Sequence, residues 1–434
     1  MRKRIDVHLL RIGMYVAELD RPWLGTPFLF QGFEIRSQDE IEELRRFCKT
    51  VFITVPDENL NPAGAAKSPP PASRPVLSDA EQRIERDVLK IINQPRAEPV
   101  YRDVTTLEQE IGEIKAAHAE ARALVLTAYD DARLGRILDT NGARRAVQTM
   151  VDSVLRNPDA LTCFTLLKKK DEYTALHSLR VSILALTFGR HLGLDTEQLQ
   201  VLGMGALLHD IGKVKVPNDI LNKPGRLDER EYAIMRTHVP HGVEILSNTP
   251  GIPRTALEVA RCHHERYNGS GYIEGLQGED IGFFGMIGGI VDCYDAITSD
   301  RAYHAGIPSH AALKKMYEWR SRDFHPNLVE QFIQCIGIYP IGSVVELNTG
   351  EIGVVVTMNR VRRLKPRVTL VLRANCTPLP APLTIDLMHH KTADGRACEI
   401  ERVLEAGAYG IDPVMYLPVH PPTTIPPLQT LRNR

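Results

Sequence analysis

The residues of this chain best suited to chemistry are histidines and aspartates that recur through its middle part. In order they are His177, the pair His209–Asp210, His238, the pair His263–His264, and Asp292. A lone histidine is more often a satisfied core or surface residue than a ligand. This set differs because it contains two adjacent pairs, and it therefore indicates a metal site.

Imidazole nitrogens and carboxylate oxygens, without a thiolate, suit iron, manganese, zinc or nickel. Seven ligands are too many for one ion of ordinary coordination, so the set predicts two ions that share a carboxylate. Asp210 is the natural bridge, because His209 can bind one ion while the two carboxylate oxygens span both. Two ions about 3.5–4 Å apart can share a hydroxide and hold a phosphate oxygen, which suits in-line attack on phosphorus.

The string ALLHDIGKVKVP places a lysine beside this predicted site. Gly212 permits a turn after the His-Asp pair, and Lys213 then lies close to the metals. A lysine beside a phosphate can neutralise charge or protonate a leaving oxygen. The alternative is a solvated lysine at a helix end, favoured there by the helix dipole.

The string HHERYNGSGYIEGLQG follows the second histidine pair and predicts a loop at the rim of the site. Gly269 and Gly271 suit a loop that needs positive φ or a close approach of backbone to a ligand. Tyr272 can stack on a base or donate its hydroxyl group. Further along, Arg301 is a candidate phosphate partner through its guanidinium group.

The rest of the chain divides by pattern into elements that must position these residues. Helical apolar periods with short polar breaks predict an α-helical bundle over residues 150–338. The other predicted parts are a small α/β N-terminal domain at 1–56, a linker rich in Pro and Ala at 57–77, a helical connector at 78–149, a small β module at 339–415 and an irregular tail at 416–434. The expected fold is therefore mainly α.

A seven-residue spacing between residues 107 and 128 has two interpretations. The stripe consists of Leu107, Ile111, Ile114, His118, Ala121, Val125 and Ala128. It can pair helices between two subunits and so predict a homodimer. Alternatively it packs on the neighbouring domain, which we favour because a histidine and two alanines make a weak seam.

Composition narrows the class of protein. A net charge of −1 argues against binding a nucleic-acid polymer, and no apolar run is long enough to cross a bilayer. The seven cysteines are scattered and form no CxxC pair, which indicates reduced thiols and a cytoplasmic protein.

The strings HSLRVS, LLHDIGKVKVP, ILNKPGRL, HHERYNGSGY and DCYDAITSDRAY resemble, in order and spacing, those of HD-GYP phosphodiesterases. This resemblance covers about residues 170–335. The stretch GMYVAELDRPWLGTPFLFQGF is similar to a domain of unknown function found ahead of some bacterial HD-GYP domains. The segment YPIGSVVELNTGEIGVVV is similar to the β extension that follows them.

The resemblance implies an HD-type helical bundle that hydrolyses cyclic di-GMP to pGpG, and often on to GMP. It implies a pair of divalent ions, iron first and manganese as the alternative, and GGDEF-type proteins as candidate partners. Carried over residue by residue, the seven histidines and aspartates above are the ligands. Asp210 bridges the ions, Lys213 is catalytic, and Tyr272 and Arg301 face the substrate.

The chain departs from the family pattern at four places. The family loop reads Asp-Gly-x-Gly-Tyr-Pro, whereas Asn268 and Ile273 replace its first and last residues here. Some members carry a glutamate at the position of Tyr173, which supports a third ion, so two ions are expected here. His304 stands where many members have a basic residue, at a position that would bind substrate phosphate.

Two other functions compete with this interpretation. One is a phosphohydrolase of the broader HD class that acts on another nucleotide, but that class needs fewer histidines. The other is a degenerate domain that binds a nucleotide or a partner protein without catalysis. Degenerate members tend to lose ligands, and this chain keeps all seven.

Overall fold

The fold is mainly helical, with a small sheet at each end of the chain, which confirms the predicted fold class. The computed structural model describes residues 2–20, 33–35, 38–54, 100–167, 173–300, 306–392, 394–405 and 407–419. The predicted linker at 57–77 and most of the predicted tail at 416–434 lie outside these ranges, as do Arg301 and His304.

The helices and strands are as follows. The α-helices are α1 (Gln38–Phe47), α3 (Leu107–Arg133), α4 (Thr140–Arg156), α5 (Pro158–Thr165), α6 (Tyr173–Leu192), α7 (Thr196–Leu208), α8 (Asn218–Leu221), α9 (Glu229–Arg236), α10 (His238–Ser247), α11 (Arg254–Cys262), α12 (Phe283–Thr298), α13 (Ser309–Glu318) and α14 (Pro326–Ile336). The 3-10 helices are η1 (Val7–Leu9), η3 (Ile211–Lys215), η4 (Gly278–Ile281), η5 (Ala408–Gly410) and η6 (Pro413–Tyr416). The strands are β1 (Arg2–Asp6), β2 (Tyr15–Leu19), β3 (Phe33–Glu34), β4 (Thr50–Thr54), β5 (Val344–Leu347), β6 (Ile352–Thr357), β7 (Arg367–Leu372), β8 (Pro378–Asp386) and β9 (Ile400–Val403).

The N-terminal unit is a small sheet with one helix. Its strands run in the order β1-β4-β2-β3, and each neighbouring pair is antiparallel. Val16 and Val51 from the strands, and Leu44 from α1, are fully buried in its core. This is the α/β unit expected from the sequence.

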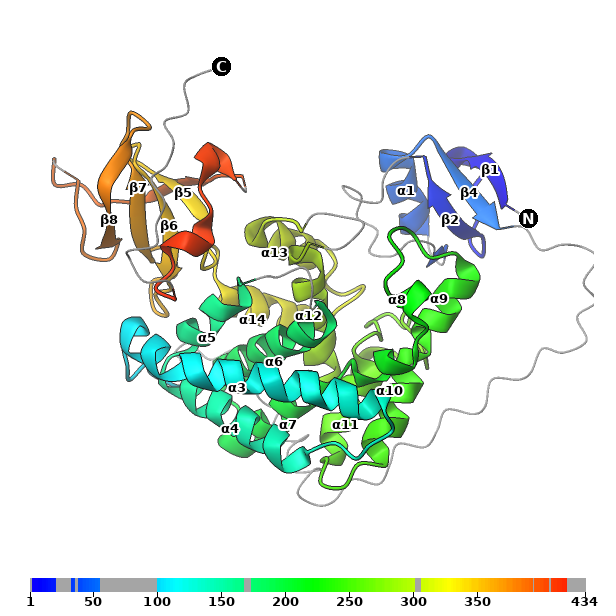
Figure 1. Ribbon diagram of the computed structural model, residues 1–434. Helices are drawn as coiled ribbons and strands as arrows, with labels where there is room; N and C mark the ends of the chain where they lie inside the picture. Colours follow the sequence, from blue (N-terminus) through cyan, green and yellow to red (C-terminus); the bar gives the residue numbers. More distant parts are fainter. Residues whose placement is uncertain are drawn as a thin grey trace, which may run out of the picture. The chain divides into compact units, whose positions relative to one another are not determined.

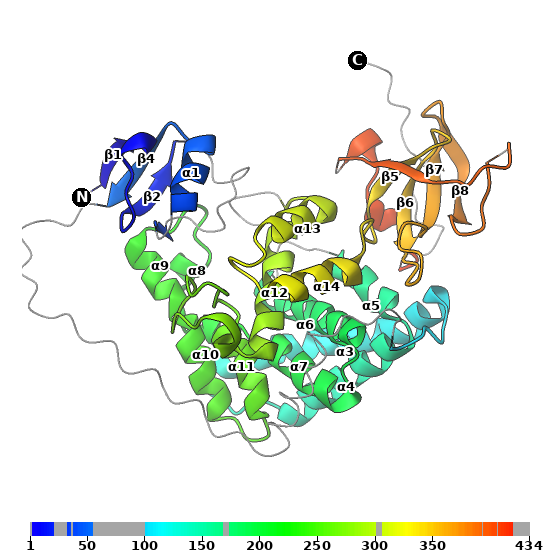
Figure 2. The same ribbon diagram turned by 180° about the vertical axis from the view of Figure 1, so that it is seen from behind.

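The helical body is built around α6 and α7, which pack closely on each other (Figures 1 and 2). A capping box of Asp195 and Gln198 starts α7, and every residue from Leu199 to Leu208 except Gln200 is buried. Glycines let its neighbours approach: a Cβ on Gly205 would lie 2.6 Å from the carbonyl oxygen of Ala256 in α11. The helix ends directly before the His-Asp pair, so its central position carries that pair into the interior.

The long helix α3 covers this body from one side, beside α4 (Figure 1). Its seven-residue stripe faces inward, because Leu107, Ile111, Ile114, Val125 and two of the alanines are buried within the chain. The interpretation that this face packs on the neighbouring domain is therefore confirmed. A homodimer through the connector would need another face of α3.

The helices α3 and α4 belong to the same compact unit as the bundle. The sequence placed a domain boundary at residue 150, where α4 continues without a break. A helical period that is buried on one face looks the same in a connector and in a bundle, so the boundary at residue 150 stays a prediction.

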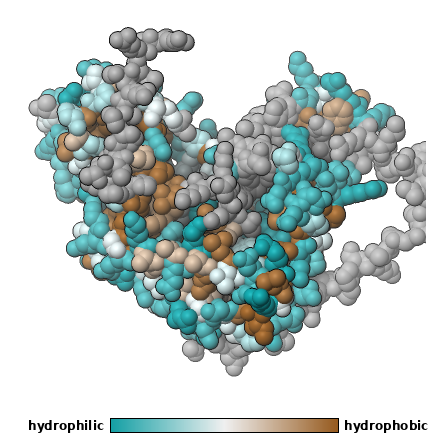
Figure 3. All heavy atoms as spheres, in the orientation of Figure 1, coloured by the Kyte–Doolittle hydropathy of each residue, from teal (hydrophilic) through white to brown (hydrophobic). Residues whose placement is uncertain are grey.

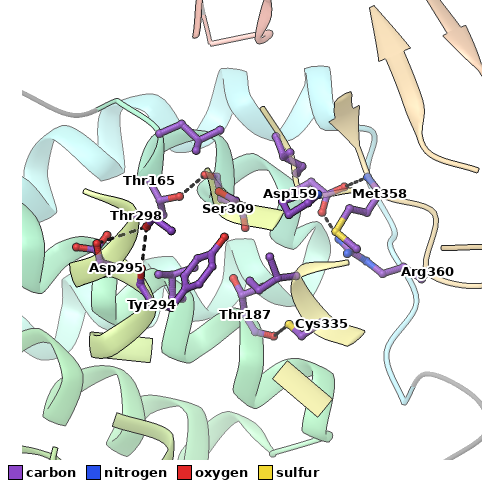
Figure 4. A pocket seen from close by; sticks show the side chains of 16 residues that line it. Asp159, Thr165, Thr187, Tyr294, Asp295, Thr298, Ser309, Cys335, Met358 and Arg360 are labelled. Atoms are coloured by element: carbon purple, nitrogen blue, oxygen red, sulfur yellow. Dashed lines mark hydrogen bonds and ion pairs between the residues drawn. The ribbon is translucent and has the colours of Figure 1, made fainter. Parts of the chain in front are cut away.

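The C-terminal β module is an antiparallel sheet with the strand order β8-β7-β6-β5-β9. The edge strand β8 carries Pro378, Pro380 and Pro382, residues that donate no backbone hydrogen bond and so discourage pairing with another chain. The module is joined to the helices by a buried carboxylate: Asp159 of α5 accepts a hydrogen bond from the backbone N–H of Met358 at 2.9 Å and pairs with Arg360. Figure 4 shows this junction beside a cavity of about 550 Å³, part of it open to solvent.

Hydrophilic residues cover much of the helical body on the face drawn in Figure 3, with hydrophobic residues in smaller groups between them. Such a surface is ordinary for helices that bury only one stripe. Among the described residues, none of the helices combines the length and the apolar character that crossing a membrane requires.

A close contact between η3 and α10 fixes the turn that follows the His-Asp pair. A Cβ on Gly212 would lie 2.0 Å from the carbonyl oxygen of His238 and 2.3 Å from the backbone nitrogen of Gly242. These neighbours are backbone atoms and cannot rotate away. Only glycine at position 212 lets η3 lie against α10, and this contact holds Asp210 close to His238.

We predict that Gly212→Ala lowers the free energy of unfolding by about 1–3 kcal/mol, because the methyl group forces η3 away from α10. The matched control is Gly112→Ala on the exposed face of α3, where a Cβ would meet nothing within 4 Å. That change should stabilise the chain slightly, by about 0.5–1 kcal/mol. Urea unfolding of both variants is the measurement, and equal stabilities would show that the contact is not tight.

Candidate metal centre

The structure brings the seven predicted histidines and aspartates together in one buried cluster. His177 comes from α6, His209 and Asp210 follow α7, His238 begins α10, His263 and His264 follow α11, and Asp292 lies in α12. Six of the seven are buried, and His264 is partly buried. Five separate helices thus contribute side chains that lie far apart in the sequence.

Hydrogen bonds through Nδ1 fix the direction of four of the imidazole rings. Nδ1 of His209 lies 2.8 Å from the carbonyl oxygen of Ala206, and Nδ1 of His238 lies 2.7 Å from that of Met235. Nδ1 of His263 lies 3.0 Å from the carbonyl oxygen of Ala260. These oxygens can only accept, so each Nδ1 carries the proton and each Nε2 has a free lone pair. His177 is held in the same sense by a carboxylate, described below.

The two oxygens of Asp210 face different histidines. Oδ2 lies 3.6 Å from Nε2 of His177 and 3.4 Å from Nε2 of His209. Oδ1 lies 3.4 Å from Nε2 of His238 and 3.8 Å from Nε2 of His263. The carboxylate therefore stands between two groups of ligands.

The other members complete these two groups. Asp292 Oδ1 lies 3.0 Å from Nε2 of His177 and 3.9 Å from Nε2 of His209. The ring of His264 lies 4.1 Å from that of His263 and 5.1 Å from that of His238, between centroids. In each of the triplets His177, His209, Asp292 and His238, His263, His264, the ligand atoms lie within 4.8 Å of one another.

Unpaired buried atoms show that metal ions fit this cluster. Nε2 of His209, Oδ1 of Asp210 and Nδ1 of His264 are buried and have no hydrogen-bond partner among the described residues. Nε2 of His238 and Nε2 of His263 face each other at 3.4 Å. Buried polar atoms without partners are costly. Cations between these atoms would satisfy them, so the buried His/Asp cluster is consistent with a metal site for more than one ion.

The electrostatics of three of the histidines, His238, His263 and His264, favour the metal-binding form. Burial lowers the pKa of His238 to about 4 and that of His263 to about 3. The pKa of His264 also lies well below its usual value, because of burial and then the neighbouring His263. Neutral imidazole is the form that offers a lone pair to a metal ion.

The two carboxylates supply the negative charge. Burial alone would raise the pKa of Asp210, but Lys213 and the neighbouring histidines outweigh it and hold that pKa well below its ordinary value. Burial likewise opposes ionisation of Asp292, and the hydrogen bond from His177 outweighs it. Both groups are therefore anions in an interior that attracts cations.

Lys213 lies at the open side of the cluster. Its Nζ forms an ion pair with Asp210 Oδ2, so it is not a solvated lysine at a helix end. The side chains of Lys213 and Asp292 are 20% and 10% exposed, whereas that of Asp210 is 1% exposed.

The glycine-rich loop lies beside the second group of histidines. Glycine is required at positions 269 and 271 for two different reasons. Gly269 has φ of +78°, as the sequence suggested. Gly271 is required by its own chain, because a Cβ there would lie 2.4 Å from Cα of Glu265. A close approach to a ligand at Gly271 stays a prediction. Asn268 accepts a hydrogen bond from the backbone N–H of Ser270 through Oδ1, as an aspartate can.

The ring of Tyr272 is already in contact with protein groups. It stacks on His264 with a centroid separation of 4.6 Å, and the guanidinium carbon of Arg236 lies 4.6 Å from its centroid. Tyr232 meets it edge-on at 6.1 Å. These contacts favour the second of its two expected roles, donation of the hydroxyl group, over stacking on a base.

Sequence reasoning missed several residues that organise the site. Glu265 is buried and accepts hydrogen bonds from the backbone N–H groups of Glu274, Gly275 and Leu276, so it closes the loop on itself. Asp295 contacts His177, and Arg236 contacts Tyr272. A buried acid directly after the His-His pair was the available signal for Glu265, and spacing of one helical turn from Asp292 was the signal for Asp295.

The cavity at the β module is separate from this cluster. Its lining includes Asp159, Tyr294, Asp295 and Arg360, but none of the seven histidines and aspartates (Figure 4). Asp295 is thus shared between the wall of the cavity and the surroundings of His177. The candidate metal centre is defined by its ligand atoms and not by the cavity.

Three family models match the chain. Residues 2–143 match a domain of unknown function (DUF3391), residues 162–328 match the HD domain, and residues 344–394 match a KOW domain associated with HD domains. The HD-domain match contains all seven residues of the cluster together with Lys213 and the glycine-rich loop.

Relatives of known activity extend this similarity. A cyclic di-GMP phosphodiesterase of Pseudomonas aeruginosa is 35% identical over 407 residues, which span 93% of this chain and 92% of the relative. A 3'3'-cGAMP-specific phosphodiesterase of Vibrio cholerae is 37% identical over 162 residues, 37% of this chain and 31% of the relative. A cyclic di-GMP phosphodiesterase response regulator of Xanthomonas campestris is 37% identical over 166 residues, 38% of this chain and 44% of the relative. The chain belongs to the HD-GYP family of HD-domain phosphodiesterases.

Proposed function

We propose that this chain hydrolyses cyclic di-GMP to linear pGpG, and on to GMP, with two divalent ions held by the seven buried histidines and aspartates. The observation that carries the proposal is the position of Asp210, whose two oxygens face two separate groups of ligands. The similarity to a cyclic di-GMP phosphodiesterase along almost the whole chain supports the substrate.

The ligand assignment follows the two groups. His177, His209 and Asp292 would hold one ion, His238, His263 and His264 the other, and Asp210 would bridge them. When bound, such a pair of ions supplies Lewis acidity that activates water and stabilises charge on a phosphate oxygen. Imidazole and carboxylate ligands accept several divalent metals, and the family resemblance favours iron first, with manganese as the alternative.

The chain's own residues orient and assist the reaction. The fixed Nδ1–H groups keep the ligand rings in place, so little reorganisation is needed when the substrate binds. Lys213 stands at the exposed side of the cluster, where it can stabilise or protonate the leaving ribose oxygen. We expect Tyr272 to donate its hydroxyl to the nucleotide, and Gly269 and Gly271 to shape the loop that carries it. Arg301 and His304 remain proposed phosphate partners outside the described residues.

The proposed substrate is tested by measuring hydrolysis of cyclic di-GMP, 3'3'-cGAMP and pGpG by the full chain. The protein is prepared both aerobically and anaerobically, and the metal content of the same samples is measured. We expect cyclic di-GMP to be consumed with pGpG as the first product. Faster hydrolysis of 3'3'-cGAMP would contradict the proposed substrate. A preparation with full metal content that hydrolyses none of the three would contradict the proposed activity.

Asp210→Ala should lose both the bound metal and the activity while its helical circular dichroism stays like that of the parent. The reason is that the bridge serves both groups of ligands at once. Asp210→Asn should lose less metal, since an amide oxygen can still coordinate but brings no charge. Asp219→Ala, an exposed aspartate in α8, is the control and should keep both. Full metal content in Asp210→Ala would show that the carboxylate does not bridge.

Lys213→Ala should keep its metal and its KM for cyclic di-GMP, yet lose roughly 100- to 10,000-fold in kcat, because the lysine acts on charge that develops only in the transition state. Lys213→Arg should recover part of the loss, since it keeps the charge but gives up a proton poorly. Lys215→Ala, an exposed lysine in the same 3-10 helix, should behave like the parent. A rise in KM in proportion to the loss of rate would make Lys213 a phosphate anchor.

A further inference from the structure

One ligand histidine is anchored differently from the others. His209, His238 and His263 lie at helix ends, where the carbonyl oxygen three residues earlier is within reach of Nδ1. His177 lies in the second turn of α6, where backbone carbonyls are used by the helix itself. Its Nδ1 instead lies 2.7 Å from Oδ2 of Asp295, which is in α12.

Asp295, the hydrogen-bond partner of His177, is itself held in place by an arginine. Arg180, one helical turn after His177 in α6, donates from Nε to Oδ1 of Asp295 at 2.7 Å and from Nη2 to Oδ2 at 2.9 Å. Arg180 is 5% exposed and Asp295 is 2% exposed. A two-pronged pair of this kind, closed off from water, leaves the carboxylate one orientation.

The contacts of Asp295 decide which nitrogen of His177 donates a hydrogen bond to it. An ionised carboxylate can only accept a hydrogen bond, so Nδ1 of His177 must carry the proton. Nε2 of the same ring points into the cluster, 3.0 Å from Oδ1 of Asp292 and 3.6 Å from Oδ2 of Asp210.

We propose that Asp295, held by Arg180, is a positioning residue of the metal centre: it sets the tautomer and direction of His177 and so aims its Nε2 at the ion shared with His209 and Asp292. A carboxylate behind a ligand histidine is worth about 10- to 100-fold in metal affinity. The assignment rests on the metal centre of the proposed function. It does not depend on which nucleotide is hydrolysed.

The experiment compares metal affinity in the full chain by competition with a chelator, using Mn²⁺. Asp295→Asn should bind Mn²⁺ about 10- to 100-fold more weakly, because an amide no longer compels Nδ1 to carry the proton. Arg180→Lys should show a smaller loss, since one charge remains but the two-pronged hold is gone. Glu110→Gln is the matched control: Glu110 is also a buried carboxylate held by two nitrogens of an arginine, Arg156, at 2.7 and 2.8 Å, but it lies in α3, which contributes no ligand to the cluster.

A second readout reports the tautomer directly, first in the parent chain. In the parent chain with ¹⁵N-labelled histidine, loaded with Zn²⁺, the His177 resonances should show a protonated Nδ1 and an Nε2 without a proton. In Asp295→Asn the Nε2–H form should appear. A parent that binds no metal would overturn the proposed function as well. A parent that binds metal, together with an Asp295→Asn variant of equal affinity or a parent His177 protonated on Nε2, would overturn this inference alone.

Discussion

The buried carboxylate of Asp210 is the constraint on which the rest of the centre depends. It is 1% exposed, and its two oxygens face histidines from four different helical segments. Burying an isolated anion in the protein interior costs several kcal/mol, on the order of its lost hydration. The surrounding groups must therefore either neutralise its charge or hold cations that do so. Lys213 and the inward-facing Nε2 atoms are arranged to do so. The helical body is therefore organised to bring this one acid into contact with ligands distant in sequence.

Packing explains how that arrangement is kept. The apolar helix α7 delivers the His-Asp pair, Gly212 lets η3 lie against α10, and hydrogen bonds at Nδ1 fix each ring. None of these devices is a metal ligand. Each removes freedom from a ligand before an ion arrives, and preorganisation of this kind lowers the cost of binding and of reaching the transition state. The Arg180–Asp295 pair extends the same principle to His177.

Much of this centre could be predicted from the sequence, and the limits have physical causes. The types and pairing of the histidines and aspartates indicated a metal cluster, and helical periods gave the mainly α fold. Contacts between distant helices could not be predicted. Asp295 contacts His177, which lies 118 positions earlier, and the sequence contains no signal for this pairing. The close approach of Gly271 to the backbone of Glu265 could not be predicted, because a glycine signals a close approach but not the group that is approached. The boundary at residue 150 stays a prediction, because buried helical faces look alike on both sides of it and α4 spans it.

The most direct test of the account is anomalous X-ray scattering from crystals of the metal-loaded chain, collected at the iron and manganese edges. The account predicts two ions, one within bonding distance of His177, His209 and Asp292, the other of His238, His263 and His264, with one oxygen of Asp210 on each. A single ion, or two ions that do not share Asp210, would contradict it.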